Sequence, residues 1–305
     1  MNALCSTRGR TIATRTIPLL ALAGLAASGF AQGAPDAALL APLVAAAPAN
    51  TRVIEYKVID TVLNAWVIDE GGSTAVRYTA IKGDGERVLG QLITGFETID
   101  PTELNADEQL AYWLNLRALL VLQTTGKAFP AAKPDRLLQP GSAFFTTKQA
   151  KVSGIALSIA DLDAIILQRG ASDPNTVYGL ALPVREAPAF PRQAYRGATV
   201  KAALDRAARA FVNRSGAIKT KADEVTVPQF LFAHRDRLGG DDQAVLAHLR
   251  SLAAPKLEQK LILTTRLSAD SRLSLNAFAE RSFADRNGNP GGFGGGGGGG
   301  RAAGS

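Results

Sequence analysis

The longest hydrophobic pattern in the chain predicts a helix over residues 105–126. Large apolar side chains occupy positions on every side of the helical cylinder, which indicates a central helix that is buried all round. Asn105, followed three residues later by Glu108, is typical of a helix start, because each side chain can satisfy a free backbone donor. Gly126 fits the helix end.

Two polar residues, Asn115 and Arg117, lie in the middle of this apolar run. A buried polar group without a partner costs about 1–3 kcal/mol, so both side chains need hydrogen-bond partners. Two interpretations stay open for Asn115: it holds the backbone of a neighbouring loop, or it lines a site. We favour the first, because buried polar groups usually have a structural partner.

Shorter patterns predict the rest of the fold. Helical spacing of apolar positions indicates further helices around residues 63–67 and over 198–213, 227–238 and 241–253. Short apolar runs predict strands at residues 75–81, 176–182, 224–227 and 260–265. Residues 144–158 resemble a hairpin that leads into a helix at Ala160. The predicted class is therefore α+β, with a single mostly helical domain and a small antiparallel or mixed sheet.

The two ends of the chain differ from its centre. Residues 1–31 combine a basic start, an apolar stretch from Ile17 and small residues up to Ala31, which is the pattern of a cleaved secretory signal; an uncleaved anchor is the alternative. Residues 32–50 are rich in Ala and Pro and read as a linker or loosely packed arm. Residues 285–305 are rich in Gly and predict a disordered tail, which leaves 51–284 as the domain.

Composition limits the possible partners and chemistry. Cys5 is the only cysteine, so removal of the signal would leave no thiol, disulfide or Cys-ligated metal. Removing the three arginines among residues 1–31, which contain no acid, lowers the formal net charge from +7 to +4. This mild excess predicts no nucleic-acid binding, although the Gly/Arg tail keeps that alternative open. We expect a periplasmic or secreted protein with no membrane span after signal removal.

Four segments resemble a known bacterial family, called domain of unknown function 547. Residues 111–120, AYWLNLRALL, are similar to its hallmark AFWINLYNAL, with Arg117 and Ala118 in place of Tyr and Asn. Residues 154–167, GIALSIADLDAIIL, resemble its helix motif G…SLxDIEHxIL. Residues 176–195, TVYGLALPVREAPAFPRQAY, resemble HFALNCASxxCPxLxxxAY, and residues 268–278, SADSRLSLNAF, resemble a motif ending in YDWSLNxF. The order of the four matches makes the resemblance fairly specific.

The substitutions within these segments change the chemistry that the family motif would permit. Ala164 and Val177 stand where the family has His, and Leu182 and Ala187 stand where it has Cys. A thiolate with a base partner is therefore impossible at these positions. The family itself supplies no settled reaction.

Few candidates for chemistry remain. His234 and His248, the two histidines, lie fourteen residues apart without metal-ligand spacing, and we predict no metal and no cofactor. Arg185 lies in the loop that would carry the cysteines, where it can pair with Glu186 or select a charged ligand. The candidate pocket residues are Asn115, Arg117, Asp161, Arg185 and His234.

These observations favour a non-catalytic exported protein that acts as a periplasmic binding or scaffold module. Its partner would be a periplasmic protein or a small ligand. The alternative is a hydrolase or transferase that uses His234 with Asp236 and a carboxylate from the helix of Asp161. A third reading assigns nucleic-acid binding to the Gly/Arg tail.

Overall fold

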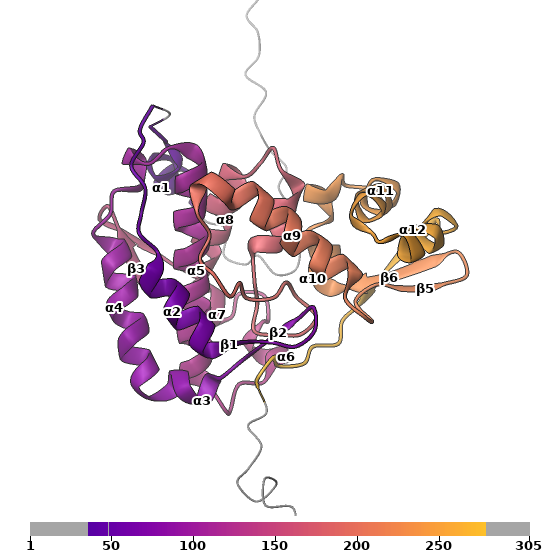
Figure 1. The fold of residues 1–305 in the computed structure, drawn as a ribbon, viewed down its shortest axis with the longest axis horizontal. Helices are drawn as coiled ribbons and strands as arrows, with labels where there is room; N and C mark the ends of the chain where they lie inside the picture. Colours follow the sequence, from indigo (N-terminus) through magenta and orange to yellow (C-terminus); the bar gives the residue numbers. More distant parts are fainter. Residues whose placement is uncertain (1–35, 48, 279–305) are drawn as a thin grey trace, which may run out of the picture.

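The computed structural model describes residues 36–47 and 49–278, which form a mostly helical α+β fold (Figure 1). Short 3₁₀- and π-helices are labelled η. The elements in chain order are α1 (Ala37–Leu40), η1 (Ala41–Val44), α2 (Lys57–Trp66), β1 (Val67–Asp69), β2 (Thr74–Val76), α3 (Tyr78–Ala80), η2 (Ile81–Gly85), α4 (Glu86–Glu97), η3 (Pro101–Glu103), α5 (Ala106–Ala128), α6 (Pro134–Leu137), α7 (Ala143–Thr146), β3 (Ala150–Val152), β4 (Ile155–Leu157), α8 (Ile159–Arg169), η4 (Pro174–Gly179), η5 (Gly197–Thr199), α9 (Val200–Asn213), β5 (Lys219–Lys221), β6 (Glu224–Pro228), α10 (Gln229–Ala233), η6 (Arg235–Leu238), α11 (Asp242–Leu252), α12 (Pro255–Ile262) and β7 (Arg266–Asp270).

Helix α5 is the centre of the core, as the apolar pattern predicts. Its side chains from Glu108 to Gln123 are all buried, and α4, α8 and α9 pack against it. Figure 1 shows α5 enclosed between α4 on one side and α8 and α9 on the other. A helix with apolar residues on every side needs this arrangement, because any exposed face would leave large side chains in water.

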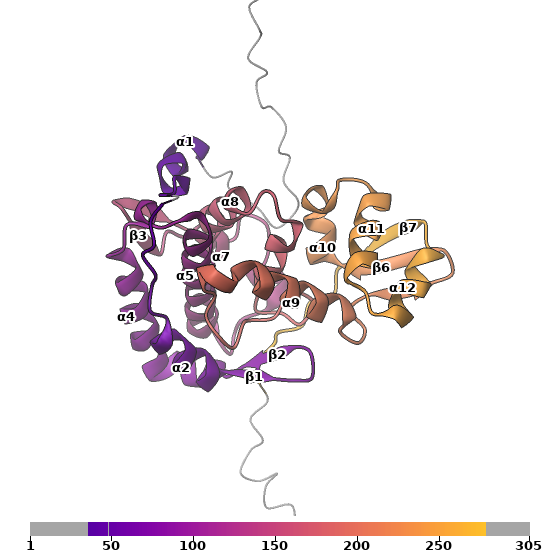
Figure 2. The same ribbon diagram turned by 45° about the horizontal axis from the view of Figure 1, so that its top comes forward.

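The strands form three small sheets. The antiparallel pairs β1–β2 and β3–β4 are hairpins, and the third sheet has the order β5–β6–β7. In that sheet β5 runs antiparallel to β6, whereas β7 runs parallel to β6 with Glu224 opposite Arg266. The mostly helical α+β class with a small mixed sheet is thereby confirmed. Figure 2 shows β6 and β7 on one side of the molecule, beside α10, α11 and α12.

Three of the predicted strands are wrong or too long. Residues 176–182 form the end of η4 and a buried loop, because Pro174 and the cap of Asp173 begin a 3₁₀-helix there. Residues 260–262 are the last residues of α12, in which Leu257 and Leu261 face the core one helical turn apart, whereas 263–265 form a turn and coil before β7 begins at 266. The strand predicted at 75–81 ends at Val76, and α3 follows at Tyr78.

The helix predicted over 227–238 is also divided. It begins as α10 after Pro228, which is the N-cap, and ends at Ala233; the 3₁₀-helix η6 follows from Arg235. The helices at 241–253 and 198–213, and the hairpin before α8, are confirmed. Asp241 caps α11 by accepting a hydrogen bond from the Ala244 amide at 2.8 Å.

Glu108 plays a different part from the one its spacing predicts. Asn105 caps α5 as expected and accepts from the Glu108 amide at 3.0 Å. The Glu108 carboxylate, however, accepts from the backbone amides of Ile54 at 3.1 Å and Gly197 at 2.9 Å. A buried acid thus joins the chain before α2 to the start of α9. Likewise Gly126 does not end α5, which continues to Ala128; its missing side chain makes room for Ile81.

The chain beyond residue 270 returns to the centre of the molecule. Val76 pairs with Ala277, and Val184 pairs with Leu275, in isolated bridges. The buried Asn276 side chain accepts a hydrogen bond from the Tyr78 hydroxyl at 2.8 Å. This last described segment therefore links β2 to the loop that follows η4.

The predicted signal 1–31 and the predicted tail 285–305 lie outside the described residues. Within the predicted linker, Leu40 and Leu43 are only 3% and 1% exposed and belong to the core. In the described part of the chain, each helix is either too short or too polar to cross a bilayer.

Replacing Gly197 by Ala is expected to destabilise the fold. The added Cβ would lie 2.5 Å from the Glu108 carboxylate and 2.7 Å from the Glu108 backbone, so we expect a loss of about 1–3 kcal/mol in urea unfolding. Gly95→Ala, in an open helical position of α4, is the control and should be neutral or stabilise by up to about 1 kcal/mol. Equal effects of both substitutions would contradict this packing.

Candidate functional site

Arg117 joins the centre of α5 to two other parts of the chain. Its side chain is 2% exposed, and its Nε forms an ion pair with the carboxylate of Asp163 on α8. Its Nη1 donates to the carbonyl oxygen of Ala181 at 2.6 Å. Ala181 belongs to residues 180–196 between η4 and η5, which we call the proline-rich loop. Because a buried guanidinium is costly to desolvate, these partners fix α8 and the proline-rich loop on α5.

Arg117 contacts the residues directly before two of the four positions at which the resemblance places the family's reactive side chains. Ala164 follows Asp163, and Leu182 follows Ala181. Val177, Leu182 and Ala187 are at most 3% exposed and belong to the hydrophobic core. The Arg185 amide donates to Ser274 at 2.8 Å, so the fourth similar segment also lies against this loop. The matched segments therefore meet in space, and hydrocarbon fills these four positions.

Asn115 holds the same loop from within the core. Its side-chain amide donates to the Tyr195 carbonyl and accepts from the Tyr195 amide, both at 2.9 Å. Both of its polar ends are thus used on one backbone segment. This geometry matches the interpretation of Asn115 as a residue that holds a neighbouring loop.

Asp161 is separate from the Arg117 cluster. Its carboxylate accepts from Ser158 in a capping box at the start of α8 and from Lys148 at 2.5 Å. Burial raises the pKa of Asp161, but the hydrogen bonds from Lys148 and Ser158 outweigh burial and bring the pKa below its usual range. Asp161 is therefore an ionised structural cap, and the neighbouring Asp163 is the carboxylate beside Arg117.

His234 lies close to the Arg117–Asp163 pair. Its ring packs on Phe230 with centroids 4.6 Å apart, and its Nδ1 lies 2.8 Å from the Phe230 carbonyl oxygen, which requires a proton on Nδ1. Burial lowers the pKa of His234; the Phe230 carbonyl and the charge of Asp163 partly oppose this, and the charge of Arg117 adds to it. The imidazole is therefore neutral at pH 7, with Nε2 unprotonated.

His248 has a separate environment. It stacks on Tyr178 and lies 3.1 Å from the Tyr178 hydroxyl. Within residues 36–47 and 49–278, no group of three or more His, Cys, Asp and Glu side chains is arranged to hold a metal ion.

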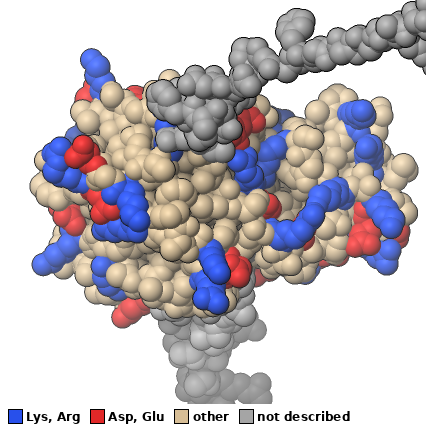
Figure 3. Space-filling view, turned by 90° about the horizontal axis from the view of Figure 1, so that it is seen from below, with Lys and Arg blue, Asp and Glu red and all other residues tan. Residues whose placement is uncertain are grey.

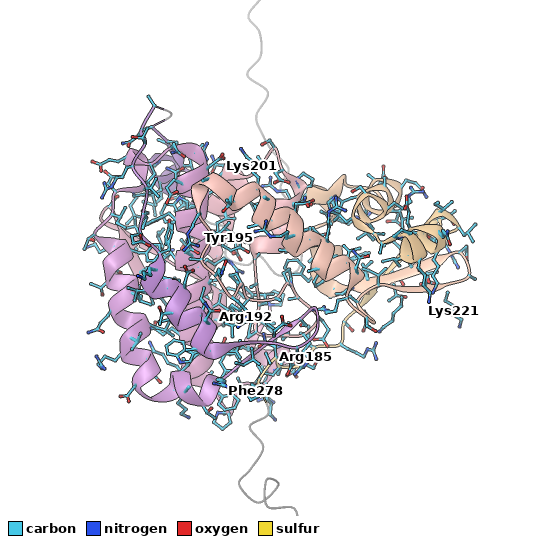
Figure 4. The ribbon with its side chains drawn as sticks, in the orientation of Figure 1. Arg185, Arg192, Tyr195, Lys201, Lys221 and Phe278 are labelled. Carbon is cyan, nitrogen blue, oxygen red and sulfur yellow. The ribbon has the colours of Figure 1, made fainter. Side chains whose placement is uncertain are left out.

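A cleft of about 520 Å³ lies on the outer side of the proline-rich loop, against α9. We call it the arginine cleft, because the charged side chains that line it are Arg192, Arg196, Arg206, Arg214 and one acid, Asp69. Figure 4 shows Tyr195 and Arg192 on the proline-rich loop near α9, with Arg185 farther along the loop towards β2. On the face drawn in Figure 3, Lys and Arg cover more of the surface than Asp and Glu.

The four arginines of this cleft differ in their partners. Arg196 forms an ion pair with Asp60. Arg214 packs over the Phe211 ring at 4.8 Å and contacts the Ser73 hydroxyl at 3.3 Å and the Ala187 carbonyl oxygen at 3.4 Å. Arg192 and Arg206 make no ion pair or hydrogen bond with any other residue that the structure describes. The guanidinium groups of Arg192 and Arg206 are thus free to bind a ligand, in the same cleft as Arg214.

Tyr195 is a further residue in the wall of the arginine cleft. Its side chain is almost completely buried, and burial raises its pKa to about 12, against the opposing charge of Arg117. The phenol therefore keeps its proton at pH 7. The guanidinium forks of this cleft are suited to carboxylate and phosphate groups.

Sequence reasoning found some of these residues and missed others. Arg117 and His234 come together, whereas Asn115 and Asp161 serve in separate structural contacts. Arg185 pairs with Glu70 from the β1–β2 turn and lies at a neighbouring cleft. The arginine cleft was missed, because Arg192, Arg206 and Arg214 come from a loop, a helix face and a helix end and form no sequence motif.

Replacing Arg117 by Met should destabilise the protein strongly. The substitution leaves the Asp163 carboxylate and the Ala181 carbonyl without their donor, and we expect a loss of about 3 kcal/mol in urea unfolding. Arg209→Met is the control, because Arg209 forms an exposed pair with Asp205 on α9 and should cost less than about 1 kcal/mol. If Arg117→Met lowers the free energy of unfolding by no more than Arg209→Met does, the Arg117–Asp163 ion pair does not stabilise the fold.

Acid should weaken the fold through the half-buried histidines, His234 and His248. Because the pKa of folded His234 lies below 6.5, the unfolded chain takes up a proton first as the pH falls through 6.5. The free energy of unfolding should therefore decrease between pH 6.5 and 5, by at most about 1.4 kcal/mol per pH unit for each histidine. In urea unfolding at several pH values, His234→Phe should reduce the dependence of the free energy of unfolding on pH. An unchanged dependence would show that His234 does not cause it.

The comparisons with known proteins give one match. Neither the curated proteins nor the solved structures include a match to this chain. Residues 101–212 match the family model described as "Protein of unknown function, DUF547". The matched range contains α5, α8, the proline-rich loop and most of α9. The resemblance inferred from the sequence is confirmed for residues 101–212, the part of the chain that matches the DUF547 family model.

Proposed function

We propose that this protein is a non-catalytic binding module that holds an anionic group of a small ligand in the arginine cleft. The observation that carries the proposal is the pair Arg192 and Arg206, which have no acidic partner among the described residues and lie in a cleft with Arg214. Guanidinium groups gathered in one cleft repel one another unless an anion joins them. A carboxylate or phosphate group is the chemistry that fits.

The interior side of the proline-rich loop supports the non-catalytic part of the proposal. Leu182 and Val177 offer no lone pair for attack or proton transfer, and both are buried. The structural contacts of Arg117 and Asn115 hold this loop firmly on α5. A loop fixed from the inside presents Arg192 and Tyr195 in set positions, which lowers the entropy cost of binding.

The rival enzyme has one supporting observation: His234 lies near enough to Asp163 for the carboxylate charge to oppose the lowering of its pKa by burial. In its favour, Nε2 of the neutral imidazole is an acceptor. Against it, Asp163 is occupied by Arg117, and Nδ1 is bonded to the Phe230 carbonyl oxygen. Turnover of ester, amide or phosphoester substrates that is lost in a folded His234→Ala variant would establish the rival.

Isothermal titration of the purified chain with citrate and with inorganic phosphate tests the anion site. We expect binding of at least one of the two, weakened at least tenfold in Arg192→Ala/Arg206→Ala, because each lost charge-assisted hydrogen bond is worth about 1.5–3 kcal/mol. The control is Arg209→Ala on the same helix as Arg206, which should leave the affinity unchanged. Absence of binding, or equal affinity in the double variant, would refute the anion site.

We also propose that the protein acts in the periplasm or outside the cell. The basic start and apolar stretch of residues 1–31 support this. Expression with the native N-terminus in a Gram-negative host, followed by cell fractionation and mass measurement, should give a periplasmic or secreted chain that begins at Gln32. Recovery of the full-length chain in the cytoplasm would contradict export.

A further inference from the structure

The arginine cleft adjoins a second cleft, which has a volume of about 600 Å³. Arg214 lines both clefts, and the β1–β2 turn gives Gly72 to the first and Gly71 to the second. Figures 1 and 2 both show this turn close to the C-terminal end of α9, which Arg214 follows. Because the two clefts meet at Arg214, the charges of one act on a ligand in the other.

The charges of the second cleft balance one another when Arg214 is left aside. Its other charged side chains are three cations and three acids, namely Arg185, Lys219, Arg272, Glu70, Glu186 and Asp270. Each of the three cations forms an ion pair with Glu70 or Asp270. Glu186 accepts hydrogen bonds from Ser274, and its charge acts on both Arg214 and Arg272. The second cleft therefore adds no net charge to that of Arg214.

The arginine cleft, in contrast, has an excess of positive charge. Arg196 is balanced by its ion pair with Asp60, and the one acid in the wall is Asp69. Together the walls of the two clefts contain seven cationic side chains, and the acids are the four in the walls and Asp60, which makes five. Two positive charges among these residues are therefore uncompensated.

An excess of two charges favours a ligand that carries two negative charges. A dianion neutralises the excess, whereas a monoanion leaves one of the guanidinium groups to repel the others. A nucleic acid or another polyanion would bring additional negative charges against Asp69 and Glu186, at a cost in affinity. The charge count thus separates a dianion from both smaller and larger charges.

The three arginines without an ion pair suit a phosphate group better than a carboxylate. Arg192 lies on the proline-rich loop, Arg206 on the exposed face of α9, and Arg214 directly after α9. Burial lowers the pKa of Arg214, so its guanidinium has lost part of its hydration and gains from an anion that replaces the water. A phosphate monoester offers three acceptor oxygens in different directions, whereas a planar carboxylate offers two.

A row of alanines leaves space beside these arginines. Ala203, Ala207 and Ala210 line the arginine cleft, and their spacing of four and three residues puts them on one side of α9. The next position on this side is Arg214. Because a methyl side chain is short and apolar, the row can accommodate the organic part of a ligand whose anionic group lies among the arginines.

We propose that the ligand is a phosphate monoester. Its dianionic phosphate lies among Arg192, Arg206 and Arg214, and its organic part lies along the row of alanines on α9. This inference rests on the proposed function, because it specifies the charge and the organic part of the ligand in the same anion site.

Isothermal titration with phenyl phosphate and phenyl sulfate tests the charge of the ligand. The two esters have the same shape, but at pH 7.5 the phosphate carries two charges and the sulfate one. We expect phenyl phosphate to bind at least tenfold more tightly. At pH 5 this preference should fall to about twofold, because the second pKa of a phosphate monoester is about 6. Succinate, which carries its two charges on separate carboxylates, should bind at least tenfold more weakly than phenyl phosphate.

Two variants test the placement of the ligand. Arg206→Gln lowers the charge excess to one and should weaken phenyl phosphate at least threefold more than it weakens phenyl sulfate. The control Arg209→Gln, on the same helix but outside the cleft, should leave both affinities unchanged. Ala207→Leu fills the row of alanines and should weaken phenyl phosphate at least fivefold more than it weakens inorganic phosphate.

The outcomes separate this inference from the proposed function. Phenyl phosphate and phenyl sulfate that bind equally at pH 7.5, and are both lost in Arg192→Ala/Arg206→Ala, overturn the phosphate monoester and leave the anion site standing. Succinate that binds as tightly as phenyl phosphate has the same consequence. An unchanged affinity for phenyl phosphate in Ala207→Leu overturns the position of the organic part. Failure of citrate, phosphate and both esters to bind overturns the inference and the anion site together.

Discussion

The ion pair between Arg117 and Asp163 is the interaction on which the rest of the site depends. A guanidinium in the centre of α5, whose residues from 108 to 123 are all buried, loses nearly all of its hydration, and only close acceptors offset that cost. Asp163 supplies one from α8, and the Ala181 carbonyl supplies another from the proline-rich loop. These acceptors come from two different segments. The ion pair and the hydrogen bond that the buried Arg117 requires therefore set the positions of both α8 and the proline-rich loop.

This constraint connects the two sides of the proline-rich loop. The inner side carries Leu182 and Ala187 into the core and is held by Arg117 and Asn115. The outer side then carries Arg192 and Tyr195 towards α9, where they meet Arg206 and Arg214 in one cleft. In this chain the inner side has hydrocarbon where the resembling family has cysteine, and the anion site that we propose lies on the cationic outer side. A structurally fixed loop with exposed arginines is suited to recognition.

The parts of the fold that sequence reasoning predicts are those with local causes. The burial of α5 follows from apolar residues on all sides, and the caps of Asn105 and Asp241 follow from backbone donors within three residues. The failures involve distant partners. Glu108 binds the amides of Ile54 and Gly197, and residues 176–182 are apolar because α5 and α9 surround them, although no strand lies beside them. The arginine cleft was equally inaccessible, because its side chains meet only after α9 packs beside the loop.

The most direct measurement of the central claim is the citrate affinity of Asp163→Asn, combined with amide hydrogen exchange over residues 180–196. Asp163 lies on α8 and does not line the arginine cleft, so the substitution reaches the cleft only through Arg117 and the proline-rich loop. Our account predicts a folded protein with faster exchange in this loop and citrate binding weakened at least threefold. A folded variant with unchanged exchange and unchanged citrate affinity would contradict the claim that the buried ion pair positions the binding surface.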